Sequence, residues 1–320
     1  MMKEHYGVSH WPDEKEIFAK MDRLVNQPLH HIKPEAMKRY LNYFDTRCRS
    51  SKAMIEEAKK VIPGGVQHNL AFNYPFPLVI TKAEGAYLYD IDGNRYVDYL
   101  QAGGPTLLGS NYEPVNRKVW EVVRESGPVT GLFHPYEMKL AEKIRECMPW
   151  VEMYRCLASG TEADMVAIRI ARTYTGKQRI VKVGGAYHGW SDQLVYSLHI
   201  PYTKTFEAHG IPKEASANTC EFFPGDVDGL RKVLEENEKY GGTAAVLIEP
   251  FGPESGTRPV AMDFAAKARE LCDEFGALLI FDEVISGFRA ALGGAAEVYG
   301  IQPDLVCFGK IIGGGLPVGA

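Results

Sequence analysis

From about residue 106 onward, the chain alternates between short apolar runs and segments with helical spacing of apolar residues. Nearly continuous apolar runs are typical of strands buried on both faces of a parallel sheet. The predicted strands are 179–183, 244–248, 277–284 and 304–308. The predicted helices are 113–125, 136–148, 162–174, 229–240 and 262–275. This alternation predicts an α/β fold with a mostly parallel central sheet and flanking helices.

The N-terminal part of the chain follows a different pattern. It begins with a polar, helix-rich segment that includes a helix predicted at 53–62, and residues 78–100 then alternate around Asp92-Gly93, a strong hairpin signal. We therefore predict two domains. Residues 1–105 form a helical arm and antiparallel strands that are part of a small domain, and residues 106–320 form the large domain.

A long stretch inside the predicted large domain has no clear periodicity. Residues 191–225 contain Pro201, Gly210, Pro212 and Pro224, which interrupt any regular element. Loops of this length usually serve a function or lack a fixed conformation. Two interpretations stay open, a mobile cover over a binding site and a static surface excursion.

Composition and charge exclude several classes of function. A net charge of −5 with no basic run argues against a nucleic-acid partner or an acidic membrane surface. No apolar run approaches the ~20 residues of a membrane helix, and the N-terminus lacks the core of a signal peptide. The six cysteines show no metal-ligand spacing, so we predict no metal site and reduced thiols in a cytoplasmic protein.

Lys310 follows the last predicted strand and precedes three glycines at 313–315. Open α/β sheets bind ligands at the carboxyl ends of their strands, and glycines let the backbone approach a ligand closely. Partial burial would lower the pKa of such a lysine and keep part of it neutral, as Schiff-base formation with an aldehyde requires. The alternative is an ordinary surface lysine at a strand end.

Asp282 lies near the end of the preceding predicted strand. A buried carboxylate needs a cation or hydrogen-bond donors, because an unpaired one costs several kcal/mol. If Lys310 holds pyridoxal phosphate (PLP), Asp282 can pair with the protonated pyridine nitrogen and maintain the ring as an electron sink. A helix cap or a structural salt bridge is the alternative.

Ser159, Gly160 and Thr161 are predicted to begin a helix. The free N–H groups and the positive dipole end of a helix start bind phosphate oxygens, and hydroxyl groups add donors. The stretch before them, 155–158, is predicted to be a short strand. An ordinary N-cap explains the same residues and is compatible with an anion site.

Unusual residues also follow two other predicted strands. Tyr187 lies among glycines, so its ring could stack on an aromatic cofactor. The neighbouring His188 could assist proton transfer or brace the loop. Glu249 ends the strand 244–248 and is predicted to order water or backbone near the cofactor.

Five motifs occur in order along the chain, namely Ser-Gly-Thr-Glu-Ala, Tyr-His-Gly, Ile-Glu-Pro, Phe-Asp-Glu-Val-Ile-Ser-Gly-Phe-Arg and Gly-Lys-Ile-Ile-Gly-Gly-Gly-Leu-Pro-Val-Gly. In this respect residues 47–320 resemble the class III aminotransferases, and most of all the glutamate-1-semialdehyde 2,1-aminomutase branch. The resemblance implies the fold type I of PLP-dependent transferases and amino-group transfer through a pyridoxamine intermediate. It also implies a small-molecule amino acid or amino-aldehyde substrate.

The resemblance assigns a role to several residues. Lys310 matches the Schiff-base lysine, Asp282 the pyridine partner and Tyr187 the aromatic residue that stacks on the ring. Residues 159–161 match the phosphate loop, although Ala158 stands where the family commonly has asparagine.

The chain departs from the aminomutase pattern after Val66. Aminomutases usually have Asn-Ser-Pro-Val-Arg there, whereas this chain has Gln-His-Asn-Leu-Ala at 67–71, so the arginine that holds a substrate carboxylate is missing. Arg258 and Arg289 are candidates to replace it. The following Tyr-Pro-Phe-Pro at 74–77 resembles relatives that act on β-amino acids, so an aminotransferase for a β-amino or other amino acid is the alternative.

Family members continue beyond the position of Ala320 into a C-terminal small domain, which we expect to be missing from this chain. The resemblance further implies a homodimer for the full-length protein. Two other interpretations stay open. One is a fragment that binds PLP without turnover, and the other is a lysine Schiff-base lyase that uses no cofactor.

Overall fold

The computed structural model describes residues 13–127, 131–195 and 208–320. The chain divides into two compact units, one of Met1–Asp22 with Thr130–Ala320 and the other of Arg23–Val129. Helix α1 (Glu14–Val25) contains the first boundary. The division near residue 130 differs from the boundary predicted at 105, because α4 (Glu113–Ser126) belongs to the unit that contains the antiparallel strands.

The unit of Arg23–Val129 contains a small antiparallel sheet. Its strands are β1 (Ile80–Glu84), β2 (Tyr87–Asp90) and β3 (Arg95–Val97), in the order β1-β2-β3. Tyr89 pairs with Arg95 across the predicted turn, which confirms the hairpin. The helices before it are α2 (Pro34–Arg47) and α3 (Arg49–Ala58).

Two aspartates build the hairpin turn and join it to α3. The Asp90 carboxylate accepts hydrogen bonds from the N–H of Asp92, the N–H and side-chain amide of Asn94, and the hydroxyl of Tyr96. The Asp92 carboxylate accepts from the N–H groups of Ser50 and Ser51 in the first turn of α3. The turn is therefore stabilised by carboxylates that satisfy otherwise unpaired backbone donors.

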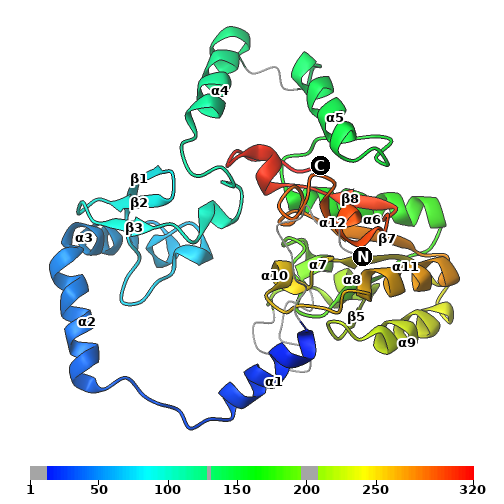
Figure 1. The fold of residues 1–320 in the computed structure, drawn as a ribbon, viewed down its shortest axis with the longest axis horizontal. Coiled ribbons are helices and arrows are strands. Elements are labelled where there is room, and N and C mark those ends of the chain that lie inside the picture. The colour runs from blue at the N-terminus through cyan, green and yellow to red at the C-terminus, as the bar shows by residue number, and fades with distance from the viewer. Residues whose placement is uncertain (1–12, 128–130, 196–207) are drawn as a thin grey trace. The chain divides into compact units, whose positions relative to one another are not determined.

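The large unit contains a parallel sheet of five strands in the order β5-β4-β6-β7-β8. Figure 1 labels β5, β7 and β8 of this sheet. The strands are β4 (Arg179–Val183), β5 (Thr219–Phe222), β6 (Thr243–Ile248), β7 (Leu278–Asp282) and β8 (Leu305–Cys307). Every neighbouring pair is parallel. The predicted α/β class and the parallel central sheet are thus confirmed.

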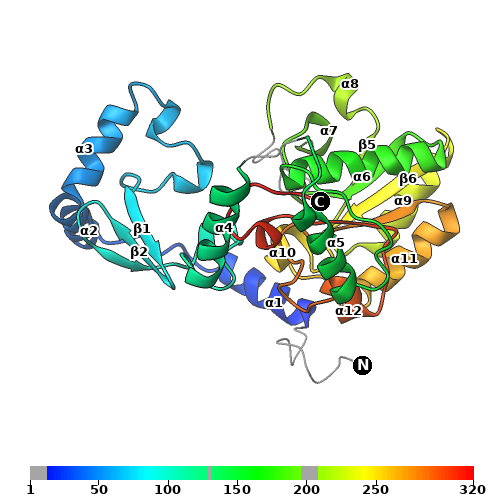
Figure 2. The same cartoon turned by 90° about the horizontal axis from the view of Figure 1, so that it is seen from above.

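Alternate side chains of each strand face opposite layers of helices. On β7, Leu279 and Phe281 pack with α9 (Val227–Glu238) and α11 (Phe264–Phe275), whereas Ile280 packs with α6 (Gly160–Thr175). Figure 2 shows α6 on one side of the sheet and α9 and α11 on the other. The other helices of this unit are α5 (Pro135–Cys147), α7 (Asp192–Val195), α8 (Lys213–Ser216), α10 (Pro253–Gly256) and α12 (Gly294–Tyr299). Both faces of the sheet are therefore buried, as its apolar strands require.

The structure corrects two predictions. Residues 191–225 are not one long loop, because they contain α7, α8 and the edge strand β5. Half of the residues of β5 are polar, so its sequence lacks the apolar run that predicted the other strands. Pro201 lies outside the described residues. Among the residues described, 155–158 form no strand, and Leu157 only makes an isolated antiparallel bridge with Gly319.

We expect Leu247→Ala to lower the free energy of unfolding by about 2–5 kcal/mol, because the side chain is fully buried between α6 and the sheet and its removal leaves a cavity. Urea denaturation followed by circular dichroism measures the change. Leu292→Ala is the matched control, because Leu292 is 69% exposed and should cost less than about 0.5 kcal/mol. Equal losses in the two variants would contradict this account of the core.

Candidate active site

The carboxyl edge of the parallel sheet gathers four of the residues predicted from the sequence. His188 follows β4, Glu249 follows β6, Asp282 ends β7 and Lys310 follows β8. All of these strands run in the same direction, so their carboxyl ends meet at one edge of the sheet. The edge therefore concentrates an amine, an imidazole and two carboxylates.

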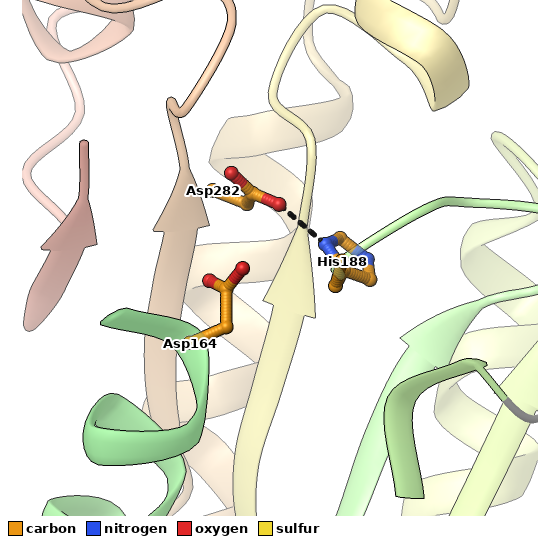
Figure 3. Close-up of side chains that lie close together, drawn as sticks. All are labelled: Asp164, His188 and Asp282. Atoms are coloured by element: carbon orange, nitrogen blue, oxygen red, sulfur yellow. Dashed lines mark hydrogen bonds and ion pairs between the residues drawn. The ribbon is translucent and has the colours of Figure 1, made fainter. Parts of the chain in front are cut away.

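Asp282 and His188 form a buried pair. His188 Nδ1 lies 2.7 Å from Asp282 Oδ2, and the two residues are 1% and 6% exposed in that order. Their strands are not neighbours, because β6 lies between them, and Figure 3 shows the pair spanning the end of that strand. The pair therefore holds the loop after β4 against the tip of β7.

The tautomer of the imidazole decides which group donates in this pair. An ionised carboxylate only accepts hydrogen bonds, so with Asp282 in that form His188 Nδ1 carries the proton and donates it. The N–H of Val284 donates to the other oxygen at 2.9 Å. Burial lowers the pKa of His188, and the carboxylate of Asp282 opposes this effect. His188 is thus placed as a neutral donor, with its buried Nε2 unpartnered among the described residues.

Asp164 lies beside this pair, although the sequence pattern did not single it out. It is 1% exposed, and Figure 3 shows it projecting from α6 toward Asp282. Burial raises its pKa well above the usual aspartate range, and the negative charge of Asp282 adds to the rise. A signal was present in the sequence, because this aspartate lies one residue from the apolar series Ala163, Ala167 and Ala171 of a predicted helix.

Lys310 begins a short 3-10 turn (Lys310–Gly313) with a φ of 41°, in the left-handed region that non-glycine residues rarely adopt. Such strain is found most often at functional sites. Partial burial lowers the pKa of its amine, and the carboxylates of Asp282, Glu249 and Glu254 oppose the shift. The amine is therefore partly desolvated and lies among acidic groups.

Glu249 and Glu254 form the acidic side of the site. The Glu249 carboxylate is buried and accepts a hydrogen bond from the N–H of Glu254 at 3.0 Å, so it holds the start of α10. Burial raises the pKa of Glu254, and the charge of Lys310 opposes the rise. Glu254 was not predicted as a site residue, and no sequence pattern marks it, because it lies in the four-residue α10 with an irregular φ of 53°.

The start of α6 has the geometry predicted for residues 159–161. Ser159 is the N-cap, and its hydroxyl accepts a hydrogen bond from the N–H of Glu162 at 3.3 Å. The Glu162 carboxylate accepts in turn from the N–H of Ala158 at 2.8 Å. The N–H groups of Gly160 and Thr161 have no acceptor within the helix, as at any helix start.

Glycines bring the other segments close to this helix start. A Cβ added at Gly160 would lie 2.7 Å from the Val284 side chain, and one at Gly189 would lie 2.3 Å from Thr161 Oγ1. At Gly309, next to Lys310, a Cβ would lie 3.0 Å from Val284. The loop after β4, the end of β7 and the end of β8 therefore all pack around the start of α6.

The remaining predicted residues, one tyrosine and two arginines, have other surroundings than the residues described so far. Tyr187 is 42% exposed, and partial burial raises the pKa of its hydroxyl. Arg258 lies between the rings of Phe18 and Phe223, with its guanidinium carbon 4.7 and 4.6 Å from their centroids. Arg289 is exposed. The guanidinium group of Arg258 is thus engaged by two aromatic rings.

Comparison with known proteins agrees with this geometry. Residues 70–320 match the family model of the class III aminotransferases. The chain belongs to that family. It is 43% identical over 282 residues to a glutamate-1-semialdehyde 2,1-aminomutase of Chloroherpeton thalassium, which covers 85% of this chain and 64% of the relative. The resemblance predicted from the five motifs is thereby confirmed.

Two solved structures of transaminases are similar to this structure. A transaminase with PLP bound superposes with a TM-score of 0.78 at 31% identity, over 85% of this chain and 63% of the other. A β-phenylalanine aminotransferase from Variovorax paradoxus gives a TM-score of 0.77 at 32% identity, over 88% and 62%. The chain thus spans less than two thirds of the length of each of these relatives.

We expect Gly189→Ala to destabilise the large unit more than Gly176→Ala. Both glycines have a positive φ, so each substitution costs about 1–2 kcal/mol in backbone strain. At Gly189 the new Cβ also collides with Thr161, whereas nothing lies within 4 Å at Gly176. The free energy of unfolding should fall by at least about 1 kcal/mol more for Gly189→Ala, and equal losses measured by urea denaturation would refute the close approach.

Proposed function

We propose that the chain binds PLP through Lys310 and catalyses amino-group transfer of the glutamate-1-semialdehyde 2,1-aminomutase kind, interconverting amino and carbonyl groups of a small molecule. The observation that carries the proposal is the placement of Lys310 and Asp282 after two neighbouring strands, β8 and β7, at one edge of the sheet. The similarity to aminomutases and to a transaminase with PLP bound supports it.

The residues at this edge fit the three parts of the coenzyme. An aldehyde needs an amine that is partly neutral, and burial lowers the pKa of Lys310. A pyridine nitrogen needs a carboxylate, which Asp282 offers. A phosphate needs N–H donors, and the start of α6 offers those of Gly160 and Thr161 with the hydroxyls of Ser159 and Thr161. All of these groups lie in one compact unit.

PLP bound here would supply an aromatic ring that accepts electrons from the substrate carbon. The protein's own residues do the rest. The Lys310 amine would hold the coenzyme, and its Nζ would accept and return a proton when free. Asp282 would pair with the ring nitrogen, and His188, 2.7 Å away, would orient that carboxylate. Tyr187 is 42% exposed, and its ring would stack on the coenzyme.

Glu249 positions the segment that contains Glu254 near Lys310 and does not react itself. Its carboxylate is engaged by the N–H of Glu254, whose own carboxyl group lies near the Lys310 amine. Both acidic groups lower the cost of a charged amine at this position. They would therefore limit how far burial depresses the pKa of Lys310, which leaves the amine able to alternate between its two protonation states.

The wider setting is part of the same proposal. We place the protein in the cytoplasm, and the six free cysteines, all in the described ranges, agree with a reducing compartment. Across the described ranges, each helix is too short or too polar to cross a membrane. A homodimer is proposed for the full-length protein by analogy with the family.

A second candidate is an aminotransferase for β-amino acids. The arginine that would clamp the carboxylate of glutamate semialdehyde is missing at 67–71, and Arg258 is engaged between two aromatic rings. The similarity to a β-phenylalanine aminotransferase also favours this candidate. It uses the same coenzyme site and differs only in the substrate that reaches it.

Lys310→Ala should abolish the visible absorption band that forms when PLP is added to the purified chain, because covalent attachment needs this amine. Absorbance titration measures the loss, with Lys213→Ala as the control because Lys213 is exposed on α8. A band that persists in Lys310→Ala would show that another lysine holds the coenzyme. A wild-type chain without any band would refute the coenzyme site.

The substrate class follows from which amines change that band. Glutamate semialdehyde and a panel of α- and β-amino acids are added in turn to the PLP-loaded chain, and product formation is followed by chromatography. The aminomutase proposal predicts that the semialdehyde is converted to its amino-shifted isomer. Conversion of β-amino acids alone would favour the second candidate and contradict the first.

A further inference from the structure

The proposed function gives no task to the most deeply buried carboxylate at the site. Asp164 lies in the second turn of α6, among Ala163, Ala167 and Ile168 of the core that α6 forms with the sheet. Burial of a carboxylate in apolar surroundings is costly unless it is neutral or paired. One of its oxygens, Oδ1, has no hydrogen-bond partner among the described residues.

Asp164 faces the Asp282–His188 pair directly. One donor atom from each of the three side chains lies within 4.8 Å of the other two, and all three residues are buried (Figure 3). The period-2 alternation of β7 explains the placement, because Asp282 follows Phe281 and so points to the side of the sheet that α6 covers. Two acidic side chains thus meet in a water-poor layer.

The groups around Asp164 come from every element packed against it. Asp282 of β7 and Glu249 after β6 are negative neighbours, and Lys310 after β8 is the positive one. The thiol of Cys307 on β8 lies close to the carboxyl group and is at best a weak donor. By contrast, Asp282 receives two strong donors, from His188 and from the N–H of Val284.

We propose that Asp164 retains its proton at neutral pH and acts as a positioning residue that leaves Asp282 as the one negative charge of this three-residue cluster. The inference rests on the proposed function, because Asp282 matters in this way only if it faces the coenzyme ring. Two carboxylates this close do not both ionise readily in a buried site. The proton stays on the partner with the poorer donors, and that is Asp164.

The direct test is infrared spectroscopy of the purified 320-residue chain. A protonated carboxyl group has a C=O stretching band above the amide region, and Asp164→Asn should remove one such band from the wild-type spectrum. The measurement is made near pH 8 to ionise most of Glu283, whose buried carboxyl group has its pKa raised to about 7. Asp263→Asn is the matched control, because Asp263 is exposed and paired with Lys267, and it should leave the band unchanged.

The dependence of the free energy of unfolding on pH is a second test of the protonation of Asp164, and it needs no coenzyme. A carboxyl group whose pKa is raised by folding binds more protons in the folded chain than in the unfolded one. The free energy of unfolding therefore falls as pH rises above about 4, the ordinary aspartate value. Asp164→Asn cannot titrate, so its stability relative to wild type should increase over this range, whereas that of Asp263→Asn should not.

The visible absorption band of the PLP-loaded chain shows whether Asp164 affects the coenzyme ring. In the wild type, the visible band should shift at the pH at which the infrared band of Asp164 disappears, and the visible band of Asp164→Asn should not shift there. If Asp164 had a purely structural role, the visible bands of the wild type and of Asp164→Asn would change with pH in the same way.

The possible failures can be told apart. If PLP does not attach to Lys310, the proposed function fails while the infrared test of Asp164 still stands. If PLP attaches and the carboxyl band is the same in wild type and Asp164→Asn, Asp164 is ionised and the inference alone is overturned. A divalent metal retained in stoichiometric amount after dialysis, and lost in Asp164→Asn, would also overturn it, because a cation would replace the proton.

Discussion

The hydrogen bond between Asp282 and His188 is the interaction on which the arrangement of the site depends. It joins the loop after β4 to the tip of β7 and crosses the end of β6, the strand between β4 and β7. A carboxylate at the tip of a buried strand would be costly alone, and the imidazole together with the N–H of Val284 stabilises it. The pair therefore fixes the loop that carries Tyr187 and Gly189, and Gly189 in turn lies against Thr161 at the start of α6.

Two properties of the fold place the charged groups of the site together. Parallel strands bring their carboxyl ends to one edge, which unites residues far apart in the sequence. The alternation of side chains then sends Asp282 toward α6, where Asp164 already lies. Because α6 covers this side of the sheet, the two carboxylates meet in a buried layer away from water.

The sequence was sufficient to predict the elements that have a strong local pattern. Strands β4, β6, β7 and β8 carry apolar runs, and the positions where these runs end were enough to indicate Lys310, Asp282 and Glu249. Strand β5 was missed because only half of its residues are apolar, and its position at the sheet edge is set by pairing with β4. The stretch before Ser159 was wrongly predicted to be a strand, since its backbone pairs with Gly319 only at Leu157.

The contacts that the sequence did not reveal join distant segments of the chain. Asp164 lies beside an apolar series in the sequence of its helix, but its acidic neighbour is known only once the direction of α6 over the sheet is known. Glu254 reaches Lys310 only through an irregular turn. His188 was considered either a proton carrier or a brace, and its partner was not predicted, because the pairing depends on the order of strands in the sheet.

A crystal structure of the chain grown with PLP tests the central claim most directly. The account predicts continuous electron density from Lys310 Nζ to the coenzyme, the ring nitrogen at the Asp282 carboxylate, and the phosphate at the N–H groups of Gly160 and Thr161. Coenzyme bound at another surface, or density at this edge that does not reach Lys310, would contradict it.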